Sequence, residues 1–111
     1  MKKHQSAFHI YSKGQRIRIP VRELQFVEVR ADGCVLHLTH SHIISEETPE
    51  RIWSCLPEDS FVAVRRKFMI NLHYISGICD QYIHMNTGLI PQRDRQTGRI
   101  SAHWLQPGCV A

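Results

Sequence analysis

The sequence predicts a mainly β domain of short antiparallel strands with one substantial helix. Apolar and polar residues alternate strictly over residues 15–19, so Ile17 and Ile19 face inward while Arg16 and Arg18 face water. Turn signals that contain glycine separate short runs rich in β-branched and aromatic residues. The spacing of apolar residues changes to a helical period only over residues 46–56. These three patterns together favour antiparallel sheets accompanied by a single helix.

The first half of the chain is expected to hold five strands, at residues 7–11, 16–19, 25–30, 34–39 and 43–45. Residues 12–14 predict a hairpin turn between the first two strands, and Asp32-Gly33 is a strong hairpin signal between the next two. Pro20 ends the second strand because proline has no backbone N–H to donate. Residues 21–24 predict one turn of helix before the third strand.

The expected helix begins with Glu46 and Glu47, whose carboxylates favour the positive end of a helix dipole, and it ends at Pro57. Its apolar face consists of Ile52, Cys55 and Leu56, with Trp53 at the margin. Further strands are expected at residues 61–65, 75–79, 81–85 and 89–91. The pattern of residues 92–111 is polar and ambiguous.

The chain has 111 residues, which suffices for one hydrophobic core. Its net charge of +4 and isoelectric point near 9.1 suggest an anionic partner. The charge is uneven, because residues 1–22 contain six cations and no acid, whereas residues 46–59 are mostly acidic. A fold built from this chain is therefore expected to have one basic and one acidic side.

Four cysteines are widely spaced and form no CxxC pair, and an apolar leader does not follow Met1-Lys2-Lys3. No apolar stretch approaches the roughly 20 residues of a membrane span. We therefore expect a cytoplasmic protein without a membrane partner. Its thiols should be reduced and should pack as small core residues.

Signatures of catalysis are missing from the sequence: it has no GxSxG, no phosphate-cradling glycine loop and no HExxH. We expect no enzyme activity, no cofactor and no small-molecule substrate. His37, His40 and His42 with nearby Cys34 are the best metal candidates. They fall near a predicted hairpin tip where polar residues belong, and no second cluster completes a site, so no metal is predicted.

Residues 61–75 place three consecutive cations, Arg65, Arg66 and Lys67, inside an otherwise apolar run. Burial of unpaired charge is very costly, so the strand must break or reach the surface there. A cationic loop beyond a rigid sheet suits phosphate contacts, and arginine suits bidentate contacts to guanine. The alternative is a solvated basic turn that pairs with the acidic helix, and spacing alone leaves both readings open.

The order of these segments resembles the LytTR family, the all-β DNA-binding modules often found behind response-regulator receiver domains in bacteria. Residues 19–28 resemble the family's opening signature, and the helix ending at Leu56 is followed in register by Phe61. Residues 61–75 resemble the family pattern F-x-R-h-H-R-S-Y-L-V-N-x-x-x-I, where h is apolar. The outright matches in this stretch are Phe61, Val64, Arg66, Asn71 and Ile75.

The resemblance implies an elongated arrangement of small antiparallel sheets whose loops enter successive DNA major grooves. It implies a stand-alone transcription factor without enzyme activity, acting as a homodimer on repeated sites in double-stranded DNA. The LytTR-like domain is expected over residues 8–105, between a basic tail at 1–7 and a C-terminal tail at 106–111. No receiver domain is expected, so control would come from abundance, a partner or self-association.

The resemblance also implies site residues. Arg66 matches a DNA-contacting position, Arg65 and Lys67 share its loop, and Arg30 lies in a second DNA-facing hairpin. Near the C-terminus the family's contacting arginine falls on Asp94, so Arg93 or Arg95 would have to substitute. Phe61, Asn71 and Ile75 match structural positions of the signature, and we expect the Asn71 side chain to tie down a turn.

The departures from the family pattern support a second hypothesis. Ala63 replaces an arginine, Arg65 a histidine and Lys67 a serine, and Asp94 stands at the C-terminal contact position. The alternative is a protein-interaction module that uses the basic loop on an acidic partner, with DNA binding lost.

Overall fold

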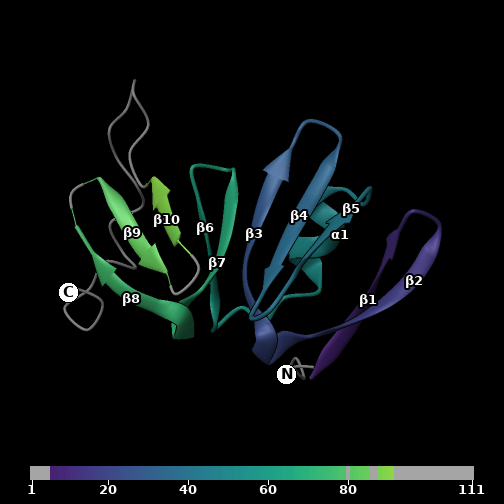
Figure 1. Cartoon of the computed structure of the whole chain (residues 1–111), viewed down its shortest axis with the longest axis horizontal. Coiled ribbons are helices and arrows are strands. Elements are labelled where there is room, and N and C mark those ends of the chain that lie inside the picture. Colours follow the sequence, from purple (N-terminus) through teal and green to yellow (C-terminus); the bar gives the residue numbers. More distant parts are fainter. Residues whose placement is uncertain (1–5, 80, 86–87, 92–111) are drawn as a thin grey trace.

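The computed structural model describes residues 6–79, 81–85 and 88–91, which form three antiparallel sheets in series (Figure 1). The first is a hairpin of β1 (Ala7–Ser12) and β2 (Gln15–Pro20). The second has five strands in the order β5-β4-β3-β7-β6, and the third has the order β10-β9-β8. The predicted mainly β class is confirmed.

The strands of the central sheet are β3 (Leu24–Arg30), β4 (Gly33–Leu38), β5 (His42–Ser45), β6 (Phe61–Val64) and β7 (Phe68–Asn71). The third sheet consists of β8 (Ile75–Ile78), β9 (Tyr82–Met85) and β10 (Gly88–Pro91). Two single-turn 3-10 helices, η1 (Val21–Glu23) and η2 (Leu72–Tyr74), precede β3 and β8. The helical turn expected before the third strand is thus present.

The central sheet is buried on both faces because successive side chains of its strands point to opposite sides. One face packs against the β1–β2 hairpin and the α-helix, in a cluster that includes Ile10, Ile19, Leu24, Leu36, Ile52 and Met69. The other face packs against the third sheet, in a cluster made of Phe26, Val64, Ile70, Ile83, Met85 and Ile90. The central sheet is therefore the scaffold to which the two outer sheets are fixed.

The helix α1 (Pro49–Ser54) is shorter than the 46–56 that the sequence predicted. Thr48 is its N-cap and accepts a hydrogen bond from the Arg51 N–H, and Pro49 occupies the first helical turn, where proline is favoured. Glu46 and Glu47 precede the helix, and their carboxylates do not stabilise its dipole. Their assignment to the helix was wrong because their carboxylates bind backbone N–H groups of the β1–β2 hairpin instead.

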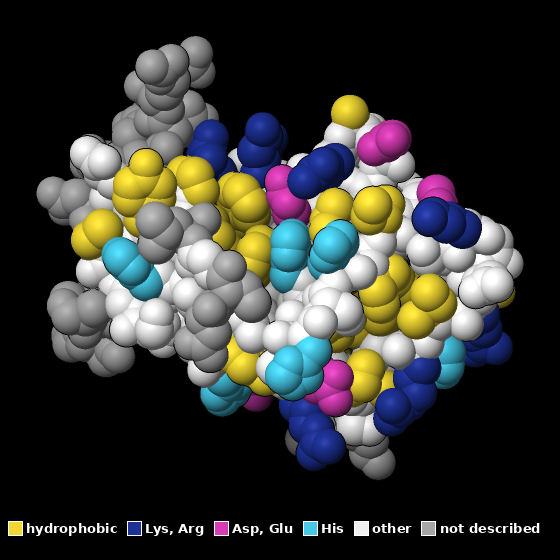
Figure 2. Space-filling view, viewed as in Figure 1, with side chains coloured by type: hydrophobic (Ala, Val, Ile, Leu, Met, Phe, Trp, Pro, Cys, Tyr) yellow, Lys and Arg dark blue, Asp and Glu magenta, His cyan; other side chains and the backbone are white. Residues whose placement is uncertain are grey.

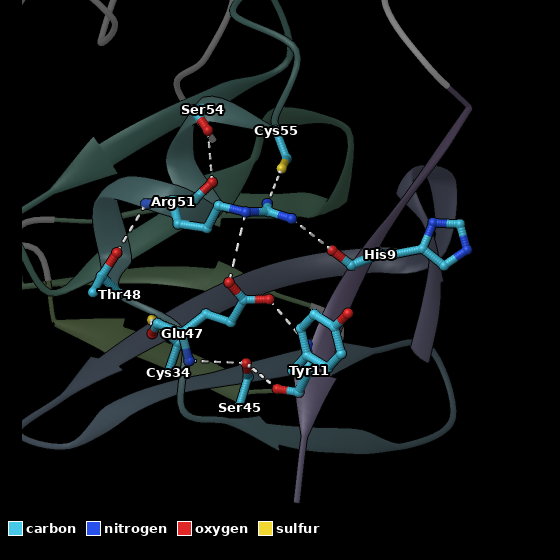
Figure 3. Close-up of polar contacts among 9 residues, drawn as sticks. All are labelled: His9, Tyr11, Cys34, Ser45, Glu47, Thr48, Arg51, Ser54 and Cys55. Carbon is cyan, nitrogen blue, oxygen red and sulfur yellow. Dashed lines mark hydrogen bonds and ion pairs between the residues drawn. The ribbon is translucent and has the colours of Figure 1, made fainter. Parts of the chain in front are cut away.

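Polar contacts join the hairpin to this helix (Figure 3). The Glu47 carboxylate accepts from the Tyr11 N–H at 2.9 Å and lies 3.6 Å from Nε of Arg51. Arg51 in turn donates to the His9 carbonyl at 3.1 Å, and the Ser45 hydroxyl donates to the Tyr11 carbonyl at 2.7 Å. The two-stranded sheet is thus held by hydrogen bonds as well as by its apolar face.

The predicted alternation in β2 is confirmed, since Ile19 is fully buried while Arg16 and Arg18 are exposed. The cysteines differ in burial. Cys34 lies in the core and the half-buried Cys55 packs against the same core cluster, whereas Cys79 is exposed, so the expected core packing is found for Cys34 and in part for Cys55 but not for Cys79. None of the helices in the described residues is long and apolar enough to cross a membrane.

Asn71 connects β7 to the neighbouring strand and to the following turn. Its buried side chain donates to the Leu24 carbonyl at 3.0 Å and accepts from the His73 N–H at 3.0 Å, which caps η2. We expect Asn71→Ala to lower the free energy of unfolding by about 2 kcal/mol, because it removes a cap and leaves a buried carbonyl without its donor. Urea denaturation checks this value. An unchanged midpoint for Asn71→Ala would show that the two hydrogen bonds do not contribute to stability.

Candidate nucleic-acid interface

Two tight turns lie at one edge of the central sheet. The β3 strand pairs antiparallel with both β4 and β7, so the β3–β4 turn and the β6–β7 turn point the same way (Figure 1). Figure 2 shows Lys and Arg side chains gathered along this upper edge. The edge therefore presents cations from segments that are distant in the sequence.

The β6–β7 turn holds three consecutive cations. The N–H of Lys67 donates to the Val64 carbonyl at 3.1 Å, and the residues between them, Arg65 and Arg66, have φ of 58° and 60°. Positive φ at both central positions is the pattern of a type I′ turn, which normally selects glycine or asparagine. The strand breaks where the sequence required it to break, at the cost of two arginines in a left-handed conformation.

This turn is fixed to the neighbouring strand. Beyond the paired residues Glu28 and Phe68, the N–H of Val29 donates to the Lys67 carbonyl at 2.7 Å. The backbone of the turn is thus hydrogen-bonded both within itself and to β3. The backbone atoms from which the side chains of this turn project are therefore held in fixed positions.

The three cations differ in their surroundings. Arg66 and Lys67 are exposed, and neither side chain has a hydrogen bond or ion pair within the described residues. Arg65 is half-buried, and its Nε is buried without a partner in that part of the chain. Arg66 and Lys67 are therefore available to an external anion, whereas Arg65 is partly shielded from solvent.

Arg30 occupies the end of β3, beside the β3–β4 turn. Its guanidinium lies 3.2 Å from the Glu28 carboxylate, and its side chain is 56% exposed. Burial raises the pKa of Glu28, but hydrogen bonds and charge from Arg30 and His37 outweigh it, so this pKa lies below its ordinary value. Glu28 therefore stays ionised at neutral pH and competes with any phosphate for Arg30.

Sequence reasoning missed Glu28, although a signal was present. Residues two apart in a strand share a face, so the alternation along β3 places the side chains of Glu28 and Arg30 next to each other. On the same face His37 stacks on Phe26, with 4.2 Å between ring centroids, and its Nε2 lies 3.4 Å from Glu28. Burial lowers the pKa of His37 more than Glu28 raises it, which favours the neutral ring at pH 7.

We expect Glu28→Gln to bind DNA about two- to fivefold more tightly, because it frees Arg30 and removes a negative charge from the cationic edge; surface ion pairs are worth up to about 1 kcal/mol. Fluorescence anisotropy at fixed salt measures the change. Glu23→Gln is the matched control, since it makes the same charge change at the opposite end of β3. An equal effect of both variants would mean that total charge, and not Arg30, is responsible.

The histidines considered as metal ligands do not converge. His37 and His42 are paired across β4 and β5 with ring centroids 6.1 Å apart, while His40 lies in the preceding turn. Over residues 6–79, 81–85 and 88–91 no group of three or more His, Cys, Asp or Glu is placed to hold a metal ion.

The remaining predicted site residues are placed as follows. Phe61 is 2% exposed in the first core cluster, and Ile75 packs against the second. Arg93 and Arg95 lie outside the described residues. The β10 strand ends at Pro91 and runs toward the same upper edge as the β6–β7 turn (Figure 1).

Comparisons with known proteins agree with this arrangement. A family model described as the LytTr DNA-binding domain matches residues 14–92. Among solved structures, a LytTr DNA-binding domain from Bacillus cereus superposes with a TM-score of 0.68 at 18% identity, covering 79% of this chain and 86% of that one. Among curated proteins, none matches the sequence.

Proposed function

The chain belongs to the family of LytTr DNA-binding domains, and from this premise we propose that it is a transcriptional regulator that reads specific sequences in double-stranded DNA. The β6–β7 turn would enter the major groove, with Arg66 contacting bases. The β3–β4 turn would contact the flanking backbone. No catalytic step is part of this function.

One observation carries the proposal: two exposed cations, which have no partner among the described residues, lie on a turn whose backbone is hydrogen-bonded to the central sheet. Strained backbone persists where the surrounding structure enforces it, and it is concentrated at functional sites. Asn or Gly would fit the left-handed positions better, so stability alone does not account for the arginine at position 66. Recognition of an anion does account for it.

Affinity would come from phosphate contacts and specificity from base contacts. Lys67 and Arg30 suit the phosphate backbone, whereas the planar fork of Arg66 suits the O6 and N7 acceptors of guanine. Each phosphate neutralised adds about −0.9 to the slope of log affinity against log salt concentration. Binding as a homodimer on repeated sites would double the number of phosphate contacts and the number of base contacts.

Selection of bound sequences from random duplex DNA tests this function. We expect an enriched motif, and a repeat within it would give the spacing of two copies. Anisotropy titrations of the selected duplex over a range of salt concentrations should show a steep loss of affinity. Absence of an enriched motif together with no binding at low salt would favour the interaction module with an acidic partner.

A further inference from the structure

An apolar pocket of about 290 Å³ lies between helix α1 and the central sheet, next to the β6–β7 turn. Its apolar walls are formed by Val29, Pro49, Trp53, Ala63, Phe68 and Met69. Two charged residues, Glu50 from the helix and Arg66 from the turn, also line it. The volume is close to the lower end of the range for small-molecule sites, about 300 Å³.

Two of the apolar residues that line the pocket are exposed. Trp53 is 40% exposed, although it is one of the largest apolar groups of the chain. Ala63, which is also exposed, contributes only a methyl group where the family pattern has an arginine. A longer side chain at this position would occupy part of the pocket volume.

The charge of Arg66 points to the kind of molecule that fits. Arg66 lines this mostly apolar pocket, and its guanidinium has no partner among the described residues; a charge pair formed beside apolar groups is less screened than one in open water. Glu50 would repel any anionic group, and most strongly one with several negative charges, so a single negative charge on a ligand would have to lie nearer to Arg66 than to Glu50. Apolar walls, one free cation and one carboxylate together suit a compact apolar body that carries a single negative charge.

We propose that this pocket binds small amphipathic carboxylates, with the apolar body against Trp53 and Ala63 and the carboxylate paired with Arg66. The pairing would occupy the residue to which the proposed function assigns the base contact. Such a ligand would therefore compete with DNA, and that consequence alone rests on the proposed function.

A titration followed by NMR tests the site with 2-naphthoate as the probe and 2-naphthylmethanol as its neutral counterpart. The readout is the indole N–H signal of Trp53, identified by its loss in Trp53→Phe. We expect saturable shifts with both compounds and about tenfold tighter binding of the carboxylate, since a charge-assisted hydrogen bond is worth more than a neutral one. No saturable shift, or equal affinity for both compounds, would overturn the proposal.

Two variants separate the pocket from its charge. Ala63→Leu fills the space and should lower the affinity for both compounds at least about tenfold, because the inserted methylenes compete with the ligand for the same volume. Arg66→Gln should weaken 2-naphthoate about tenfold and leave 2-naphthylmethanol unchanged. Retention of both affinities in Ala63→Leu would place the compounds elsewhere and contradict the proposal.

A competition experiment tests the link to DNA. Saturating 2-naphthoate should lower the affinity of the wild type for the selected duplex about tenfold. It should leave the affinity of Ala63→Leu for the duplex unchanged, and 2-naphthylmethanol should lower the affinity of the wild type by a smaller factor. If the chain binds no DNA, the NMR titration still decides on the pocket by itself. The contrary outcome is a concentration-dependent dimer that Ala63→Leu abolishes, with no response of the protein to 2-naphthoate. That result would mean that a second copy of the chain occupies the pocket, and it would overturn the proposal of a carboxylate ligand.

Discussion

Arg66→Ala is expected to lower the discrimination between the selected duplex and a scrambled duplex by roughly 1–3 kcal/mol, the range for one good base contact. Its side chain leaves an anchored turn and has no partner among the described residues, so no internal contact offsets the loss. Parallel anisotropy titrations with the two duplexes measure the effect. Affinity for the scrambled duplex should fall much less.

Lys67→Ala is the matched control for this result, since it removes a neighbouring exposed cation from the same turn. It should lower the affinity for both duplexes about equally and reduce the magnitude of the slope of log affinity against log salt concentration by about 1, because lysine contacts phosphates without reading bases. If Arg66→Ala also weakens both duplexes equally, Arg66 is a phosphate contact and sequence is read elsewhere.

Stability separates the side chain of Arg66 from its backbone. Alanine tolerates φ of 60° no better than arginine does, so Arg66→Ala should leave the urea midpoint nearly unchanged. Arg66→Gly should raise the free energy of unfolding by about 0.5–1 kcal/mol because glycine relieves the left-handed strain. Both variants should lose discrimination, which would show that DNA recognition costs the turn some stability.

Gly33→Ala is expected to lower the free energy of unfolding by about 4 kcal/mol. Gly33 has φ of 152°, and a Cβ added to it would lie 2.1 Å from the carbonyl oxygen of Ser45 in the adjacent strand. The conformation costs an L residue about 1–3 kcal/mol, and overpacking against the backbone of β5 costs a similar amount. Urea denaturation of the whole chain measures the loss.

Gly88→Ala separates these two contributions. Gly88 has nearly the same φ, 155°, but apart from its own chain neighbours no atom of the described residues lies within 4 Å of the position that an alanine Cβ would take. We expect this variant to lose only the conformational part, about 2 kcal/mol. Equal losses in both variants would show that β5 moves away from position 33 and that its close approach is not required.

Local patterns were sufficient to predict most of the strands and the two turns of the cationic edge. The alternation of Ile17 and Ile19, the Asp32-Gly33 signal and the cost of burying three adjacent cations each depend on a few neighbouring residues. The pairing of β3 with β7 depends on residues about 40 positions apart, so no local pattern contains it.

The start of the helix shows why a local pattern can mislead. Glu46 and Glu47 suit a helix N-terminus, yet their carboxylates accept from Lys13 and Tyr11, more than 30 residues earlier in the chain. Thr48 and Pro49 carry the correct signal, since a capping hydroxyl followed by proline marks the first helical turn. Residues far apart decided between these two local signals.

The candidate site was predicted in its composition but not in its internal contacts. The sequence indicated that Arg66 and Lys67 reach the surface, whereas the partial burial of Arg65 depends on the left-handed turn. The ion pair between Glu28 and Arg30 follows from alternation along β3, yet its stacked neighbours, His37 and Phe26, come together only through the pairing of β3 with β4.

The most direct test of the central claim, that Arg66 reads bases in the major groove, is a double-mutant cycle between protein and DNA. Wild type and Arg66→Ala would each be titrated with the selected duplex and with duplexes in which one guanine at a time is replaced by 7-deazaguanine, which lacks the N7 acceptor. We expect one guanine to couple to Arg66 by at least about 1 kcal/mol, because the bidentate contact needs both partners. Additive effects at every guanine would contradict the claim.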